Sequence, residues 1–347
     1  MKKRGRILCF CVCLILLLPS CRRSDKQLYK DEFFGAFDTI CGVSGYAQTA
    51  EQFEEHFVWI RERLLFYSRH YDIYQSYEGI TNIKDINAMA GKKAVKVHPV
   101  IFDLLKLGKE VYEESGGNVN IAFGSVLRIW HQYREEALEY PEKAALPSSD
   151  ILQEANLHTK IEDIILDEKA QTVFLKDEKM SLDVGALAKG YAVERVALEM
   201  EERGLTGYLI NAGGNIRAIG SKANGQKWKV GIQNPDTASP KPYLDVVLLE
   251  KESLVTSGSY QRFYEVGNIR YHHIIDKDTL MPSKYFESVS VIGNAKGKED
   301  AISTALFNMP LEKGMKWLEG IPEVAAVWIL PDGEKVYSSR VQRFLAK

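Results

Sequence analysis

A run of small residues joins a predicted strand to a predicted helix in Ser181-Leu182-Asp183-Val184-Gly185-Ala186-Leu187-Ala188-Lys189-Gly190-Tyr191. The helix is predicted over residues 186–203, because Gly204 can form a left-handed cap after it. Free backbone N–H groups and the helix dipole at such a junction can bind an anion, and Lys189 would add a point charge. Close packing of the helix against the strand, with Lys189 solvated, explains the small residues equally well. The segment alone leaves both interpretations open.

Apolar periodicity elsewhere predicts further helices and strands. Residues 51–68 carry apolar side chains at three- and four-residue steps, and a second helix should begin at Pro99 and end at Gly116-Gly117. A hairpin is expected over residues 163–176. Other strands are predicted at residues 208–211, 228–233, 244–249, 288–292 and 324–330, with a helix at residues 298–307. This irregular order of helices and short strands indicates an α+β fold and argues against a doubly wound parallel sheet.

Two other segments place polar side chains beside predicted strands. Asn211-Ala212-Gly213-Gly214-Asn215 has two glycines that let a backbone approach a ligand closely, although a plain turn explains them equally well. Tyr271-His272-His273-Ile274-Ile275-Asp276 contains adjacent histidines. Neighbouring side chains of a strand point to opposite faces, so at most one histidine faces a given site.

A fourth segment, Glu299-Asp300-Ala301-Ile302-Ser303-Thr304-Ala305, places a carboxylate and a hydroxyl on one helix face. Asp300 and Thr304 are four residues apart, so both could bind one hard cation. Oxygen ligands, together with waters and substrate phosphates, are what Mg²⁺ prefers. Alone the pattern is weak, because an aspartate in a first helical turn is more often a capping or dipole residue.

The N-terminus has the pattern of an exported lipoprotein. Basic residues precede an apolar run from Ile7 to Leu18, which is too short to cross a roughly 30 Å hydrocarbon core. Leu18-Pro19-Ser20-Cys21 is similar to a bacterial lipobox. We therefore expect a signal peptide over residues 1–20, a lipid on Cys21, a polar tether over residues 21–32 and an extracytoplasmic location at the cell membrane, on the periplasmic side in a Gram-negative cell. An ordinary secretory signal with an incidental cysteine is the alternative.

The composition describes an enzyme-sized body without a nucleic-acid-binding surface. Removing the four Lys and Arg residues of the signal leaves 41 basic and 47 acidic side chains, a formal charge of −6, with the two signs interspersed. No basic stripe suggests nucleic acid as a partner. Cys41 is the only thiol left once the signal and Cys21 are set aside, so disulfides are not expected to stabilise the fold.

Together and in this order, these segments resemble the ApbE-type flavin transferases. That family shows an early Met-Gly-Thr, then Thr-Asp-Gly-Ala-Phe-Asp, Leu-Asp-Leu-Gly-Gly-Ile-Ala-Lys-Gly-Tyr-Ala, Asn-x-Gly-Gly-Asp, Thr-Ser-Gly-x-Tyr, His-Ile-Ile-Asp-Pro-x-Thr-Gly and a late Asp-Ala-x-x-Thr. This chain matches them in order from about Phe33 to Leu318, including Thr256-Ser257-Gly258-Ser259-Tyr260. The resemblance implies an ApbE-like, T-fold-like domain over residues 33–347, with a mixed sheet core and packed helices.

The resemblance also implies a reaction. Family members transfer the FMN half of FAD to a threonine of an acceptor protein, forming a phosphoester, releasing AMP and requiring Mg²⁺. The expected acceptor is an extracytoplasmic subunit of an electron-transfer complex. Some relatives hydrolyse FAD to FMN and AMP instead, so an FAD pyrophosphatase is one alternative. A flavin-binding or solute-binding lipoprotein without chemistry is another.

Site residues follow from the resemblance by position. The matches to FAD contacts are Phe34, Tyr74, Asn118, Val119, Asn120, Asp183, Lys189 and Ile274. The matches to metal positions are Ala186, through its carbonyl, Asp300, Ser303 and Thr304, and Ser303 stands where some relatives have a second acid. Asn120 and Asn215 replace family aspartates, Lys277 replaces a proline and Leu280 replaces a glycine.

His273 is the candidate catalytic residue. The incoming threonine hydroxyl needs a proton acceptor, and an unperturbed histidine pKa of about 6.5 suits that role. Positioning and charge neutralisation by Mg²⁺ would supply most of the remaining catalysis.

Overall fold

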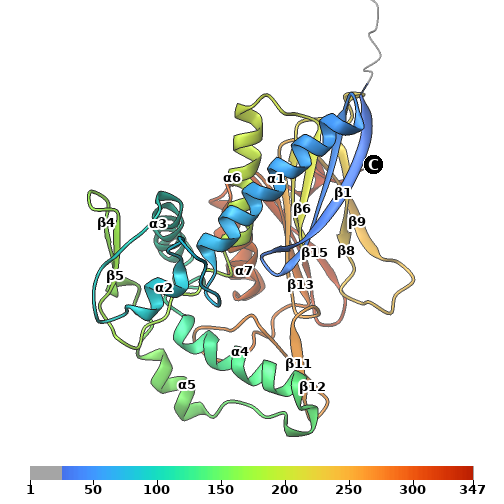
Figure 1. The fold of residues 1–347 in the computed structure, drawn as a ribbon. Coiled ribbons are helices and arrows are strands. Elements are labelled where there is room, and N and C mark those ends of the chain that lie inside the picture. The colour runs from blue at the N-terminus through green and yellow to red at the C-terminus, as the bar shows by residue number, and fades with distance from the viewer. Residues whose placement is uncertain (1–25, 347) are drawn as a thin grey trace, which may run out of the picture.

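An eight-stranded sheet forms the centre of the computed structural model, which describes residues 26–346 (Figure 1). Its strands, in spatial order, are β1 (Gln27–Ala36), β2 (Thr39–Ala47), β6 (Tyr208–Ala212), β7 (Asn215–Ile219), β10 (Ser253–Gly258), β13 (Ser288–Gly293), β14 (Val324–Ile329) and β15 (Lys335–Tyr337). Neighbouring strands of this sheet pair antiparallel. With its flanking helices, the sheet confirms the predicted α+β class.

Helices cover one face of this sheet, and a two-stranded sheet covers part of the other (Figure 1). The helices are α1 (Ala50–Tyr71), α6 (Ala188–Glu202), α7 (Glu299–Phe307) and α8 (Leu311–Glu319). The opposite layer is the pair β8 (Trp228–Gln233) and β9 (Tyr243–Leu249). Side chains of β14 alternate between the two layers: Trp328 packs with α7 and α8, and Val327 packs with β8 and β9. Every residue of β14 is therefore buried.

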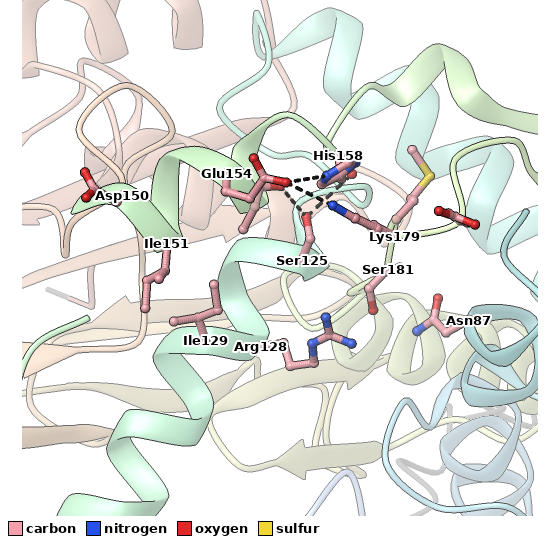
Figure 2. Close-up of a pocket in the computed structure, with 13 residues that line it drawn as sticks. Asn87, Ser125, Arg128, Ile129, Asp150, Ile151, Glu154, His158, Lys179 and Ser181 are labelled. Carbon is pink, nitrogen blue, oxygen red and sulfur yellow. Dashed lines mark hydrogen bonds and ion pairs between the residues drawn. The ribbon is translucent and has the colours of Figure 1, made fainter. Parts of the chain in front are cut away.

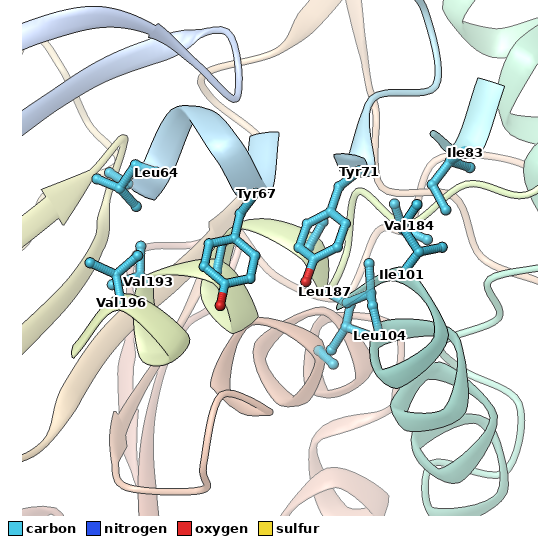
Figure 3. Close-up of a cluster of buried hydrophobic side chains, with 14 of the residues drawn as sticks. Leu64, Tyr67, Tyr71, Ile83, Ile101, Leu104, Val184, Leu187, Val193 and Val196 are labelled. Carbon is cyan, nitrogen blue, oxygen red and sulfur yellow. The ribbon is translucent and has the colours of Figure 1, made fainter. Parts of the chain in front are cut away.

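A second apolar cluster joins α1 and α6 to α3 (Pro99–Glu114) (Figure 3). Tyr67 and Tyr71 of α1 project into it from one side, Val193 and Val196 of α6 from another, and Leu104 from α3. Full burial of such side chains stabilises the fold by roughly 1.5–3 kcal/mol each. This packing fixes the direction of α6 and therefore the place where its first turn lies.

The remaining elements lie beside and below the main sheet in Figure 1. They are α2 (Ile83–Ala88), the small sheet of β3 (Val95–Lys96), β4 (Ile164–Asp167) and β5 (Thr172–Leu175), the helices α4 (Gly124–Glu139) and α5 (Ser149–Asn156), the hairpin β11 (Phe263–Val266) and β12 (Ile269–His272), and the 3-10 turns Pro141–Lys143 and Ile161–Asp163. A third 3-10 turn, Val341–Arg343, instead packs through Val341 with β8, β9 and β14. Trp130 of α4 packs against Tyr264 and Tyr271 of the hairpin, with ring centroids 6.5 Å apart in both cases. This contact holds the hairpin against α4.

Several predicted elements match the structure, and one boundary differs. The helices predicted at residues 51–68, 99–115 and 298–307 correspond to α1, α3 and α7, and the hairpin at residues 163–176 corresponds to β4 and β5. The segment 211–215 is a turn between β6 and β7, with Gly213 and Gly214 at positive φ. However, β1 begins at Gln27, so the second half of the predicted tether belongs to the sheet, where Leu28 and Phe33 pair with β2.

The predicted signal peptide, the lipidation site Cys21 and the start of the tether lie outside the described residues. Within residues 26–346, no helix combines the length and the apolar character needed to cross a bilayer.

Candidate functional site

The first turn of α6 is fastened to the first turn of α7. The Gly190 N–H donates to Asp300 Oδ2 at 3.0 Å, instead of bonding to the Ala186 carbonyl one turn earlier. A Cβ atom on Gly190 would lie 2.6 Å from the Asp300 Cβ, so only glycine permits this approach. Two consequences follow: the buried Asp300 carboxylate lies at the start of α6, and the Ala186 carbonyl stays available for another partner.

An oxygen-rich donor set results. Asp300 and Thr304 lie one turn apart on α7, and no hydrogen bond within residues 26–346 occupies the Ala186 carbonyl. Carboxylate, hydroxyl and carbonyl oxygens suit Mg²⁺, which keeps several waters or phosphate oxygens in its shell. Within residues 26–346 no group of three His, Cys, Asp or Glu side chains could hold a metal, so this set has a single carboxylate. The donor chemistry fits Mg²⁺ bound together with substrate phosphates.

Ser303 is turned away from this donor set. Its fully buried hydroxyl donates to the Asp300 carbonyl at 2.9 Å and contacts Ser257 Oγ of β10 at 2.7 Å. Ser257 also contacts Thr304 Oγ1 at 3.3 Å. The two serines therefore pack α7 onto β10 and orient Thr304.

Asn215 completes the surroundings of Asp300. Burial raises the pKa of Asp300, whereas Lys189, the Gly190 N–H and the Asn215 side chain lower it. The Asn215 Oδ1 atom is buried and has no hydrogen-bond partner within residues 26–346. The amide of Asn215 can donate a hydrogen bond to Asp300. The aspartate that the family pattern has at this position could donate only when protonated.

Lys189 lies where two hairpin tips meet. Its Nζ donates to the Gly213 carbonyl at 3.1 Å, and Gly213 in turn packs against Thr39 at the tip between β1 and β2. Burial lowers the pKa of Lys189, while Asp300 raises it. A partly desolvated ammonium beside the oxygen donors is suited to bind a phosphate.

The side chains of the two adjacent histidines point to opposite faces, as the alternation along a strand predicts. His272 is buried, its Nε2 lies 2.7 Å from the Ser283 carbonyl, and its ring packs on Phe307. His273 is exposed, and its Nδ1 lies 3.2 Å from the Arg262 carbonyl. Desolvation, followed by the charge of Arg262, lowers the pKa of His273 to about 3. The ring of His273 is therefore accessible to solvent, unlike the ring of His272.

Tyr74 and His131 form an aromatic shelf in the same region. Their rings lie 4.9 Å apart with an interplanar angle of 34°, and Tyr74 remains 58% exposed. Desolvation raises the pKa of Tyr74 to about 12, and Asp183 adds to this shift. Burial also raises the pKa of Asp183, which accepts the Gly185 N–H at 2.8 Å. Asp183 therefore lies near the shelf, at the opposite end of segment 181–191 from Lys189.

The other predicted FAD contacts are less available. Both polar ends of the Asn120 amide are engaged: Nδ2 donates to the Thr159 carbonyl and Oδ1 accepts from the Ala122 N–H. Val119 and Ile274 are buried within apolar clusters, and the Asn118 amide donates to the Ser115 carbonyl. Phe34 is 69% exposed. These residues could present backbone atoms or, for Phe34, a ring.

A cavity of about 580 Å³ lies elsewhere, between α4, α5 and residues 178–181 (Figure 2). Three of its polar side chains pair with one another: Lys179 lies 3.0 Å from Glu154, which lies 3.6 Å from His158 Nε2. Ser181 connects it to the segment that bears Asp183. None of the residues predicted for FAD, metal or catalysis lines it, so we place the functional site around Lys189 and His273 instead.

Residue-based reasoning assigned no role to His131, Arg262 or Ser257. Ser257 lay within a segment already singled out, but its contact with α7 depends on tertiary packing. Arg262 could have been found from the register of the hairpin that follows it. His131 carries no motif signal.

Comparison with known proteins identifies the family. The ApbE family model matches residues 37–328. The FAD:protein FMN transferase of Treponema pallidum is 31% identical over 342 residues, covering 92% of this chain and 90% of that protein. The protein of the same name from Klebsiella pneumoniae is 29% identical, covering 78% and 84%.

Solved structures show the same fold. The ApbE protein from Thermotoga maritima superposes with a TM-score of 0.79 at 25% identity, over 92% of this chain and all of that one. The flavin transferase ApbE from Vibrio cholerae gives 0.75 at 21% identity, over 92% and 100%. With the family model spanning most of the sequence, the chain belongs to the ApbE family.

Proposed function

We propose that this protein is an FAD:protein FMN transferase, which moves FMN from FAD to a threonine of an acceptor protein, releases AMP and depends on Mg²⁺. The observation that carries the proposal is the contact of Gly190 with Asp300, which gathers oxygen donors beside Lys189. The names of the relatives from Treponema pallidum and Klebsiella pneumoniae support the same activity.

The donor set of Asp300, Thr304 and the Ala186 carbonyl would hold the metal, which neutralises phosphate charge when bound. Lys189 supplies a second positive group for the phosphates. The aromatic shelf of Tyr74 and His131 offers a face on which the flavin ring can stack. Binding of the flavin ring at the shelf and of the phosphates at the donor set would together orient FAD.

His273 has the tautomer that a general base requires. A carbonyl can only accept, so the contact with the Arg262 carbonyl requires the proton on Nδ1. The lowered pKa keeps the ring neutral, which leaves the Nε2 lone pair free. In the proposed step the threonine oxygen bonds to the FMN phosphorus, the bond to the AMP oxygen breaks, and Nε2 receives the hydroxyl proton.

A direct assay separates this function from its alternatives. The protein is incubated with FAD, Mg²⁺ and an acceptor protein or peptide that carries a candidate threonine. Flavin fluorescence on the acceptor with an equal amount of AMP supports transfer, whereas FMN and AMP without labelled acceptor indicate a pyrophosphatase. FAD binding without AMP under any divalent metal would overturn both enzymatic readings. Loss of transfer with retained FAD binding in His273→Ala would support the assignment of the base.

We further propose that Cys21 carries a lipid that holds the domain at the outer face of the cell membrane. The sequence Leu18-Pro19-Ser20-Cys21 supports this, and β1 starts only a few residues later, at Gln27. The far end of β1 meets the tip that contacts Gly213, so the site would lie about 30 Å from Gln27, where β1 begins. Metabolic labelling with a radioactive fatty acid tests the anchor, and a Cys21→Ser variant that stayed labelled and membrane-bound would refute it.

A further inference from the structure

The register of the β11 and β12 hairpin places Arg262 opposite His273. Phe263 pairs with His272, and the next rung is the hydrogen bond from the His273 N–H to the Arg262 carbonyl, at 3.1 Å. Residues directly opposite one another in an antiparallel pair have side chains on the same face. Arg262 therefore points to the same side as the exposed His273.

That side is the one that faces α4. The rung of Phe263 and His272 carries the buried histidine that packs on Phe307. The following rung, Tyr264 and Tyr271, packs on Trp130 of α4. Because faces alternate along a strand, Arg262 and His273 share the face of the two tyrosines. This directs both toward the shelf that His131 of α4 forms with Tyr74.

The charge of Arg262 is uncompensated. Its side chain is exposed, and no carboxylate within residues 26–346 forms an ion pair with it. Arg270 on the same hairpin, by contrast, lies 3.3 Å from Glu265. The positive charge of Arg262 helps to lower the pKa of His131 and of Lys189, after burial in both cases, so the cations Arg262 and Lys189 repel one another.

We propose that Arg262 binds phosphate oxygens of FAD, beside His273 and the shelf of Tyr74 and His131. This inference rests on the proposed function and names the group that recognises its substrate. A guanidinium presents a planar fork of donors that matches phosphate geometry, and a bound diphosphate would relieve the repulsion between the two cations.

Substrate binding would then also adjust the base. Desolvation is the largest cause of the lowered pKa of His273, and the charges of Arg262, His272 and Arg134 add to it; Arg262 immediately precedes β11, His272 belongs to β12 and Arg134 to α4. A diphosphate bound to Arg262 offsets the largest of these charges. The pKa of His273 should therefore rise when the nucleotide binds, and the ring becomes a stronger base only in the loaded enzyme.

Equilibrium binding tests the assignment. ADP, FAD and riboflavin are titrated in the presence of Mg²⁺ into the wild type, Arg262→Ala, Arg262→Lys and the matched control Arg270→Ala. A lost charge-assisted phosphate contact should weaken ADP and FAD binding by about 10- to 100-fold in Arg262→Ala, and less in Arg262→Lys. Riboflavin, which has no phosphate, should bind all variants alike, and Arg270→Ala should match the wild type for each ligand.

The pKa of His273, followed by NMR, gives a second readout. It should rise on addition of ADP in the wild type, and rise little in Arg262→Ala. Equal ADP affinity of Arg262→Ala and Arg270→Ala would overturn the Arg262 assignment while the transferase stands. Failure of the wild type itself to bind FAD would overturn the proposed function and this inference together.

Discussion

Replacing Gly190 by alanine should disable the site while leaving most of the fold intact. The new Cβ would lie 2.6 Å from the Asp300 Cβ, and ordinary carbon contacts begin near 3.5 Å, so α6 and α7 must separate by about 1 Å. The bond from the Gly190 N–H to Asp300 would lengthen from 3.0 Å to about 4 Å and be lost.

The expected energies follow from this displacement. Overpacking costs about 1–3 kcal/mol, and the higher helix propensity of alanine offsets about 1 kcal/mol. Unfolding should therefore become easier by at most a few kcal/mol. The same 1 Å shift moves Asp300 away from Ala186 and Lys189, and misplacement of that size can reduce a rate about 100-fold.

Two assays measure these effects: AMP release from FAD in the presence of Mg²⁺ and an acceptor, and thermal unfolding followed by circular dichroism. Gly314→Ala in α8 is the matched control, because the tightest contact of its Cβ would be with the flexible end of Leu306, at 3.2 Å, and its contacts with Met309 and Trp328 would be at 3.9 Å. The control should keep its activity. A folded Gly190→Ala protein that releases AMP at the wild-type rate would refute the argument that the close approach of α6 and α7 builds the site.

Further predictions concern groups around the site. Burial, and then Glu194, raises the pKa of Glu299 from 4.5 to about 7, so between these pH values the folded state keeps a proton that the unfolded chain has lost. The free energy of unfolding should therefore fall by about 3 kcal/mol as the pH rises from 4.5 to 7. Urea titrations should show a smaller change of this free energy with pH in Glu299→Gln than in the wild type, and an equal change would count against the assignment. Burial raises the pKa of the Cys41 thiol to about 11, so iodoacetamide followed by peptide mapping should find Cys41 unmodified in the native protein and modified in urea; rapid native labelling would contradict its burial. Tyr74→Ala should weaken riboflavin binding about three- to tenfold through loss of the aromatic shelf, whereas Tyr74→Phe should bind like the wild type; equal affinities of all three proteins would remove the shelf from the flavin site.

The spacing of apolar residues was enough to predict helices and strands that bury side chains at regular intervals. The helix α1 buries Phe53, Phe57, Ile60 and Leu64 on one face, and this spacing is visible in the sequence. The strand β1 is different: it is an edge strand and is largely exposed, so its sequence lacks the alternation that identifies a half-buried strand. The predicted tether consequently extended into it.

The contacts that form the site could not be predicted from the spacing of residues along the sequence. Asp300 and Thr304 could be placed on one helix face by counting, but the contact of Asp300 with Gly190 joins residues 110 positions apart. The free Ala186 carbonyl depends on that contact. Resemblance to a family supplied the positions, and the packing of α6 against α7 supplies a physical reason for them. Arg262 needed the strand register, which only the folded hairpin defines.

We expect Asp300 to act through its charge in an Mg²⁺-dependent transfer of FMN. Asp300→Asn tests this, because its amide oxygen can still accept the Gly190 N–H while the carboxylate charge is lost. AMP release and acceptor labelling from FAD are measured across an Mg²⁺ titration, for the wild type and this variant at matched thermal stability. The wild type should transfer FMN in an Mg²⁺-dependent manner, and Asp300→Asn should transfer little or none; equal transfer by both proteins at every Mg²⁺ concentration would show that the charge is not needed.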